Sequence, residues 1–167
     1  MNDLENICLA CNLCCDGSLI GFVQIDAEEF PALRGILPIE ESDEIGFFLQ
    51  PCTKFCAGCT IYSQRPKQCG LFECKLLKNY EQADIDFKSA TEIVKTVIEH
   101  KQAIEDQLVN LSIALKSPSF CFQMMELKTW LTHKNRETPL INAHAVLLAD
   151  IEMLNDLVKD HFGVSYF

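Results

Sequence analysis

The sequence lacks the features that mark membrane proteins and nucleic-acid-binding proteins. No apolar run approaches the length of a membrane span, so we expect no membrane segment. The 167 residues carry 14 basic and 24 acidic side chains, a net charge of −10. Residues 1–80 hold six basic and eleven acidic side chains, and residues 81–167 hold eight and thirteen. Because a nucleic-acid binder needs a positive surface for phosphates, we expect no nucleic-acid partner.

Motifs of common catalytic and cofactor sites are also missing. The chain has no H-E-x-x-H and no G-x-S-x-G, and its seven glycines form neither a phosphate loop nor a dinucleotide fingerprint. No histidine has a glutamate three residues before it, so the Glu-x-x-His pattern of di-iron bundles is absent. We expect structural roles for His100, His133, His144 and His161. Whether the protein is an enzyme is left open.

Cysteine, in contrast, is abundant. Nine of the ten cysteines lie within the first 74 residues, in a segment C-L-A-C-N-L-C-C and in a second group further on. The repeated C-x-x-C spacing folds the backbone into tight turns that bring two sulfurs together. Thiolates are soft ligands that favour zinc, copper(I) and iron–sulfur clusters, usually four to a centre. These cysteines are Cys8, Cys11, Cys14, Cys15, Cys52, Cys56, Cys59, Cys69 and Cys74.

Two other roles for the thiols are a disulfide framework and a metal-free thiol redox sensor. Ten is an even number, and small cysteine-rich domains are often cross-linked. The opening residues M-N-D-L-E-N-I, however, show no basic n-region and no apolar h-region of a signal peptide. We therefore expect a cytoplasmic protein, where thiols stay reduced and metal binding is favoured. Cys121 stands alone and is expected to be a small buried apolar residue.

The pattern of the first 80 residues predicts short, mixed elements. We expect strands over 18–25 and 46–51, a strand fragment over 60–62, and an acidic surface loop over 38–46. Asp26 is a good N-cap for a short helix that contains Pro31. Pro66 suits the first turn of a further helix, which would carry Cys69 and turn its apolar residues inward. Those apolar residues are Leu71, Phe72 and Leu76.

From residue 85 the apolar residues recur at three- and four-residue steps, which predicts three amphipathic helices. The first, of about eight turns, has an apolar face from Ala90 to Leu115 that includes Ile98. Ser117-Pro118 starts the second, and Thr138-Pro139 starts the third, which Gly163 closes. The second is expected to bury Phe120, Met124, Leu127 and Leu131, with Met125 as core filling, and the third Ile141, Ala145, Leu148, Ile151, Leu154, Leu157 and Val158.

The fold class is therefore α+β and predominantly helical. A small cysteine-rich metal-binding module with short strands, residues 1–80, precedes a three-helix region, residues 81–167. We expect the helical region to pack on the module as one compact unit. A groove between its helices would offer room for a protein partner, but periodicity alone does not identify one.

The two cysteine groups resemble the YkgJ-type, or CxxCxxCC, cysteine-cluster family, which is described as zinc- or iron-chelating. The resemblance covers residues 8–74 and rests on C-L-A-C-N-L-C-C, a C-x6-C step, I-Y-S-Q-R-P-K-Q-C and a final C-x4-C step. Tyr62, Arg65 and Pro66 also match, while Cys56 falls outside the pattern. The resemblance implies that the metal ligands are Cys8, Cys11, Cys14, Cys15, Cys52, Cys59, Cys69 and Cys74.

What the resemblance implies about activity is limited. Most members of the family have no established reaction. A related cluster occurs in flagellin lysine-N-methylases, which are much longer, so an iron–sulfur redox or protein-modifying enzyme is the alternative function. Our first hypothesis is a cytosolic protein that holds zinc or an iron–sulfur cluster through these thiolates. Beside the cluster, Arg65 is either a residue that offsets its negative charge or an ordinary surface arginine.

Overall fold

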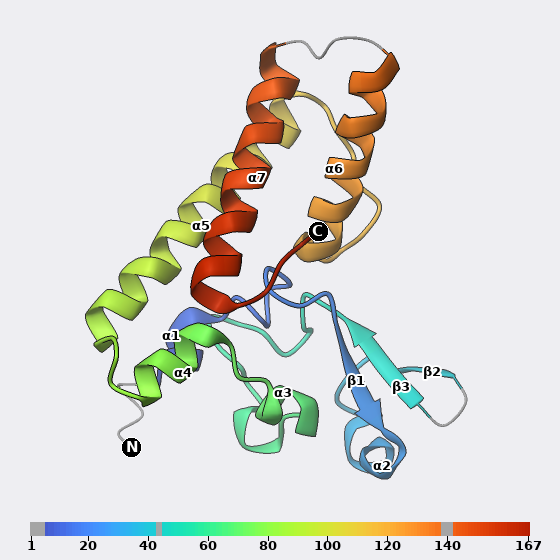
Figure 1. Ribbon diagram of the computed structural model, residues 1–167. Coiled ribbons are helices and arrows are strands. Elements are labelled where there is room, and N and C mark those ends of the chain that lie inside the picture. The colour runs from blue at the N-terminus through green and yellow to red at the C-terminus, as the bar shows by residue number, and fades with distance from the viewer. Residues whose placement is uncertain (1–5, 43–44, 138–141) are drawn as a thin grey trace. The chain divides into compact units, whose positions relative to one another are not determined.

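The computed structural model describes residues 6–42, 45–137 and 142–167 (Figure 1). The fold is α+β and predominantly helical, as the sequence predicts. The chain divides into two units: one comprises residues 1–73 with 118–121, and the other residues 74–117 with 122–167. The boundary after residue 80 that the sequence predicts, between a cysteine-rich module and a helical region, stays a prediction.

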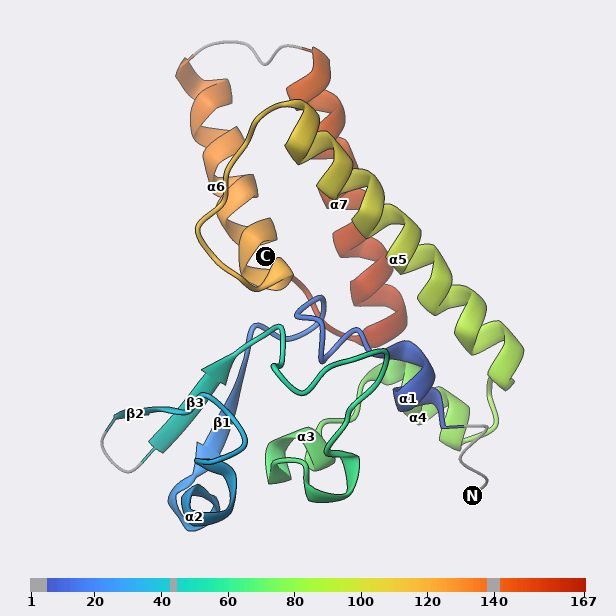
Figure 2. The same ribbon diagram turned by 180° about the vertical axis from the view of Figure 1, so that it is seen from behind.

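A three-stranded antiparallel sheet forms the framework of the first unit. Its strands are β1 (Phe22–Asp26), β2 (Glu40–Ser42) and β3 (Ile45–Leu49), in the order β1-β3-β2, and Figure 2 shows β3 between its two neighbours. β1 and β3 lie within or close to the predicted strands. The prediction of a loop over 38–46 was wrong for β2, because pairing with β3 extends an acidic segment that has no strand signal of its own.

The core of the first unit lies on one face of this sheet. Val23, Ile25 and Phe48 are buried there against Phe30, Leu33 and Leu37, which belong to or follow the short helices η2 (Ala27–Glu29) and α2 (Phe30–Leu33). Pro31 lies in the first turn of α2, where its missing N–H costs nothing. At Gly46 a Cβ atom would lie 2.6 Å from the Ile39 side chain and 2.7 Å from the Phe30 ring, so any larger residue would force these side chains to shift.

The rest of the first unit consists of short segments: α1 (Ile7–Cys11), η3 (Tyr62–Gln64) and α3 (Lys67–Leu71). The strand fragment predicted over 60–62 is wrong, because the chain turns there into η3. The helix predicted from Pro66 is broken by extended backbone at Phe72 before α4 (Lys75–Glu81) begins in the second unit. Leu71 is consequently 65% exposed rather than buried.

The described part of the second unit is built from the helices α4, α5 (Phe87–Asn110), α6 (Phe120–Glu137) and α7 (Asn142–Phe162). The first two residues of α6 belong to the first unit. α5 and α7 lie side by side, and α4 contacts both (Figures 1 and 2). An ion pair at 3.5 Å joins Lys128 of α6 to Glu152 of α7. Residues buried in this core are Val94, Val97, Ile104, Met124, Leu127, Leu131, Leu147, Ile151, Leu154 and Val158.

The three predicted helices are confirmed, with differences at their ends and faces. α5 ends at Asn110, so Leu115 lies outside it. Ile98 and Met125 are 45% and 46% exposed, and the buried residues near the start of α7 are His144 and Leu147 rather than Ala145 and Leu148. Gly163, with φ +72°, closes α7 as predicted. Two features of the predicted third helix lie outside the described residues: its start signal at Thr138-Pro139 and its apolar residue Ile141.

Candidate metal centre

The first cysteine segment is a capped single turn of helix followed by a reversal of the chain. The Asn6 Oδ1 atom accepts a hydrogen bond from the Leu9 N–H at 3.1 Å and starts α1. Asn12, in the left-handed conformation with φ +60°, ends it. The Cys15 N–H then donates to the Asn12 carbonyl at 2.9 Å, which tightens the turn. Four cysteines are thus distributed over one helical turn and one tight turn: Cys8, Cys11, Cys14 and Cys15.

Backbone hydrogen bonds join the second cysteine segment to the first. The Cys52 N–H donates to the Cys15 carbonyl at 2.8 Å, and the Phe55 N–H donates to the Cys52 carbonyl at 2.9 Å. Phe55 pairs with Cys59 in an antiparallel bridge. The Cys52 Sγ atom accepts the Lys54 N–H at 3.4 Å. The fold therefore draws Cys15, Cys52 and Cys59 into one neighbourhood although up to 44 positions separate them in the sequence.

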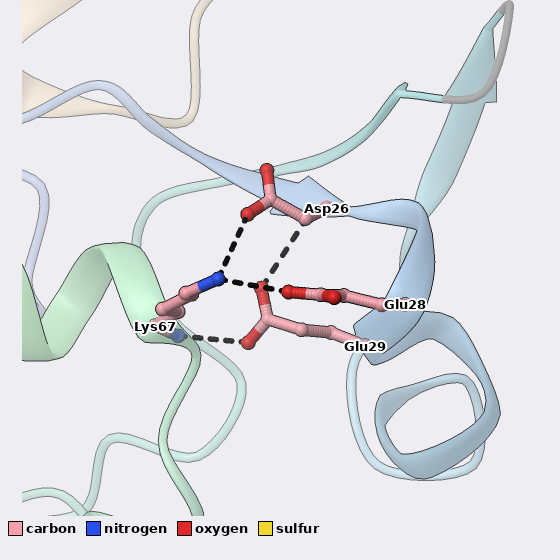
Figure 3. A network of polar contacts seen from close by, with 4 residues as sticks. All are labelled: Asp26, Glu28, Glu29 and Lys67. Carbon is pink, nitrogen blue, oxygen red and sulfur yellow. Dashed lines mark hydrogen bonds and ion pairs between the residues drawn. The ribbon is translucent and has the colours of Figure 1, made fainter.

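The third segment is α3, which carries Cys69 and is held against the end of β1. The Glu29 carboxylate accepts the Lys67 N–H at 2.8 Å and the Asp26 N–H at 3.3 Å. The Lys67 Nζ atom lies 2.8 Å from a Glu28 oxygen and 3.8 Å from an Asp26 oxygen (Figure 3). This network anchors the start of α3, and Cys69 packs with Cys52 against the sheet core.

Burial and neighbouring thiols raise the pKa of three cysteines in these segments, Cys15, Cys52 and Cys69. Burial raises the pKa of Cys15 to about 12, with the thiols of Cys59 and Cys52 adding to the shift. Burial likewise raises the pKa of Cys69 to about 12, with further contributions from Cys15, Cys52 and Cys59, while Arg65 acts in the opposite direction. Burial also raises the pKa of Cys52, partly offset by the Lys54 N–H. Cys15, Cys52, Cys59 and Cys69 therefore interact electrostatically as one group, which we call the four-thiol cluster.

The cluster has the donor chemistry of a metal site without the coordinating arrangement. Across residues 6–42, 45–137 and 142–167, no group of three or more His, Cys, Asp or Glu side chains is arranged to hold a metal ion. No disulfide joins cysteines in this part of the chain either. Metal–thiolate bonds of about 2.3 Å require deprotonated, convergent sulfurs, whereas protonated thiols have no force that draws them together. At thiolate metal sites in general, metal binding and local folding are coupled for this reason.

The remaining predicted ligands differ in their surroundings. Cys8 contributes to the electrostatic environment of Cys15, and Cys11 and Cys14 lie in the same segment. Cys74 belongs to the second unit, where its Sγ atom accepts the Leu77 N–H at 3.4 Å and caps α4. Burial raises its thiol pKa. An eight-ligand set therefore remains a prediction.

Two cysteines lie outside the predicted ligand set. Cys56 is exposed in the turn closed by its N–H and the Gly58 carbonyl at 2.9 Å, where Gly58 adopts φ +147°. Cys121 is buried, as predicted, and its N–H donates to the Gly17 carbonyl at 2.8 Å. Its thiol pKa is raised by burial alone.

Sequence reasoning missed two residues that interact with the cysteine segments. Asn6 caps α1 and also contacts Tyr62, and only the first of these roles has a sequence signal, an asparagine directly before a helical turn. Lys54 supplies its N–H to Cys52 and a positive charge near that thiol. Its position two residues after a ligand candidate is the only hint in the sequence.

Comparison of the chain with protein-family models, curated proteins and solved structures found no match. The resemblance to the cysteine-cluster family therefore depends on the motif alone. Within the described ranges, no helix combines the length and apolar character needed to cross a membrane.

Proposed function

We propose that the protein binds a metal centre, zinc or an iron–sulfur cluster, through the four-thiol cluster of Cys15, Cys52, Cys59 and Cys69. The observation that carries this proposal is that four cysteines from three separate segments lie close enough to influence the pKa of Cys15 and Cys69. Four thiolates are the complete ligand set of a structural zinc site and of most iron–sulfur clusters. The YkgJ-type resemblance supports the same chemistry.

The acid–base properties of the cluster favour a ligand role over a redox-sensor role. A reactive sensor cysteine has a lowered pKa and a partly exposed thiolate. Cys15 and Cys69 have pKa values raised to about 12 by burial and by neighbouring thiols. A bound cation removes this penalty, because it stabilises the deprotonated sulfurs directly. The proposal places the protein in the reducing cytosol, where such thiols persist.

Metal content and an ultraviolet–visible spectrum of the full chain, purified without oxygen, test the proposal and name the metal. Iron, acid-labile sulfide and broad visible absorption would show an iron–sulfur cluster. A colourless protein with zinc would show a zinc centre. Metal-free protein that also fails to bind added zinc or iron would contradict the proposal.

A matched pair of variants tests the assignment of ligands. Cys59→Ser removes a proposed ligand, and Cys56→Ser changes an exposed cysteine three residues earlier in the same turn. We expect Cys59→Ser to weaken zinc or iron binding by more than the roughly 10–100-fold that loss of an outer partner costs, and Cys56→Ser to bind as the unmodified chain does. Affinity is measured by competition with a chelator of known strength. Equal binding by both variants would contradict the assignment.

A further inference from the structure

Arg65 is held in a fixed position beside the four-thiol cluster. The centre of its guanidinium group lies 3.8 Å from the centroid of the Tyr62 ring, and its Nη1 atom donates to the Tyr62 carbonyl at 3.5 Å. On the α3 side, a Cβ atom at Gly70 would lie 3.6 Å from Arg65 Nε. The guanidinium group thus lies over the Tyr62 ring and close to Gly70, the residue that follows Cys69.

Tyr62 is itself held by the first cysteine segment. Asn6 Nδ2 donates a hydrogen bond to the Tyr62 hydroxyl at 3.1 Å, while Asn6 Oδ1 accepts the Leu9 N–H. One asparagine therefore both caps α1 and fixes the ring on which Arg65 lies. We call Asn6, Tyr62 and Arg65 the clasp. It connects α1, which carries Cys8 and Cys11, to the residues directly before α3, which carries Cys69.

The charges around the cluster give the guanidinium a role. Four thiolates bring two more negative charges than a divalent metal neutralises. The positive charge of Lys54 lies near Cys52 and that of Arg65 near Cys69, whereas the negative charge of Asp16 lies near Cys15. The nearby Lys67 ammonium is already engaged by Glu28 and Asp26. A guanidinium stacked on an aromatic ring keeps its charge and its orientation while it is partly desolvated.

We infer that Arg65 is a positioning residue of the metal centre: it fixes Cys69 through the clasp and offsets the charge of the thiolates. This inference rests on the proposed metal function. The stacking of the Arg65 guanidinium on the Tyr62 ring explains why an arginine, rather than a lysine, suits the position.

Titration of the full chain and its variants with Co(II), in reducing buffer without oxygen, tests the role of Arg65. Arg65→Met keeps the aliphatic stem and removes the charge, so we expect a roughly 10–100-fold loss of Co(II) affinity and a changed ligand-field spectrum. Arg65→Lys restores the charge without the planar stack and should recover part of the affinity. Tyr62→Phe removes only the hydroxyl that Asn6 contacts, and should weaken binding less than Arg65→Met does.

A matched control is available in the same unit. Arg34 lies over the Phe30 ring at 5.4 Å and pairs with Glu41 at 2.7 Å, without contact to the cluster. Arg34→Met also removes a stacked arginine and should leave Co(II) affinity unchanged. Circular dichroism shows which variants fold. If Arg65→Met does not fold, the Co(II) affinities of Arg65→Lys and Tyr62→Phe are compared with that of Arg34→Met. Weaker binding by both supports the role of Arg65, and equal binding contradicts it.

The outcomes separate the two proposals. Thiolate–Co(II) absorption in the unmodified chain, with equal affinity in Arg65→Met, would overturn the role of Arg65 and leave the metal function standing. The same would follow if Arg34→Met lost as much affinity as Arg65→Met, because the effect would then be one of general stability. Absence of thiolate–Co(II) absorption in the unmodified chain, together with a metal analysis that finds neither zinc nor iron, would overturn both.

Discussion

Hydrogen bonds to single buried polar residues fix segments of this protein that apolar packing alone does not hold in place. Asn155 of α7 is buried, and its Oδ1 atom accepts hydrogen bonds from the Tyr166 N–H at 2.8 Å and the Ser165 hydroxyl at 3.1 Å. It thereby fixes the segment that follows α7, and Tyr166 becomes one of the largest fully buried side chains. The helical periodicity of the sequence gives no sign of this role, because it registers only apolar positions.

Asn155→Ala should destabilise the protein by about 1–3 kcal/mol, because it leaves the buried Tyr166 N–H without its acceptor. The free energy of unfolding, measured by urea denaturation, gives the size of the loss. Asp156→Ala changes the next, exposed residue of α7 and serves as the control, with an expected change within about 0.5 kcal/mol. Equal losses in the two variants would show that the acceptor at Asn155 has no special importance.

At the scale of elements, helix starts carry local signals that the fold uses directly. Asp86 caps α5, and its Oδ1 atom accepts the Ser89 N–H at 2.7 Å. This hydrogen bond to the ionised carboxylate lowers the pKa of Asp86 below its ordinary value of 3.8. Since the folded-state pKa is the lower one, the contribution to stability is present above pH 3.8 and is lost as the pH falls through the folded-state value.

Asp86→Ala should therefore lower the melting temperature at neutral pH, and the difference from the unmodified chain should shrink as the pH falls below 3.8. Thermal unfolding followed by circular dichroism over a pH series measures this difference. Asp84→Ala removes an exposed acid two residues earlier that is not at the cap. A difference for Asp86→Ala that does not change with pH would rule out the ionised carboxylate as its cause.

Short elements elsewhere depend on partners distant in the sequence. β2 has three residues, two of them glutamate, and is a strand only because β3 pairs with it. α3 ends at Leu71 because the backbone becomes extended at Phe72, although the apolar spacing predicts a longer helix. Elements of this length are decided by tertiary pairing rather than by propensity.

At the scale of the whole molecule, the two units have different sources of stability. The first contains helices of three to five residues and strands of three or five. The second contains α4 with seven residues, α5 and α7 with 24 and 21 residues, and all but the first two of the 18 residues of α6, with a shared apolar core. Since thiolate zinc sites contribute on the order of 10 kcal/mol to folding, the first unit stands to gain most from a bound metal.

If the proposed metal centre is present, its removal with a strong chelator should unfold residues 6–73 and leave most of the helix content. Far-ultraviolet circular dichroism reports the helices, and hydrogen exchange resolved by residue reports each unit. We expect lost protection in β1 and β3 and retained protection in α5 and α7. Zinc added back should restore the first unit. Loss of all helix signal in one step, or no loss of protection at all, would contradict this prediction.

The sequence by itself determined the fold class, the three long helices, the closure of α7 by Gly163 and the cysteine-rich character of the first 74 residues. These features follow from local spacing, since a repeat of three to four apolar residues or a C-x-x-C turn acts within a few positions. The tertiary structure alone decided which cysteines share a neighbourhood, where β2 forms and how Arg65 is held. These depend on contacts such as Cys15 with Cys52 and Asn6 with Tyr62, which join positions that local patterns do not relate.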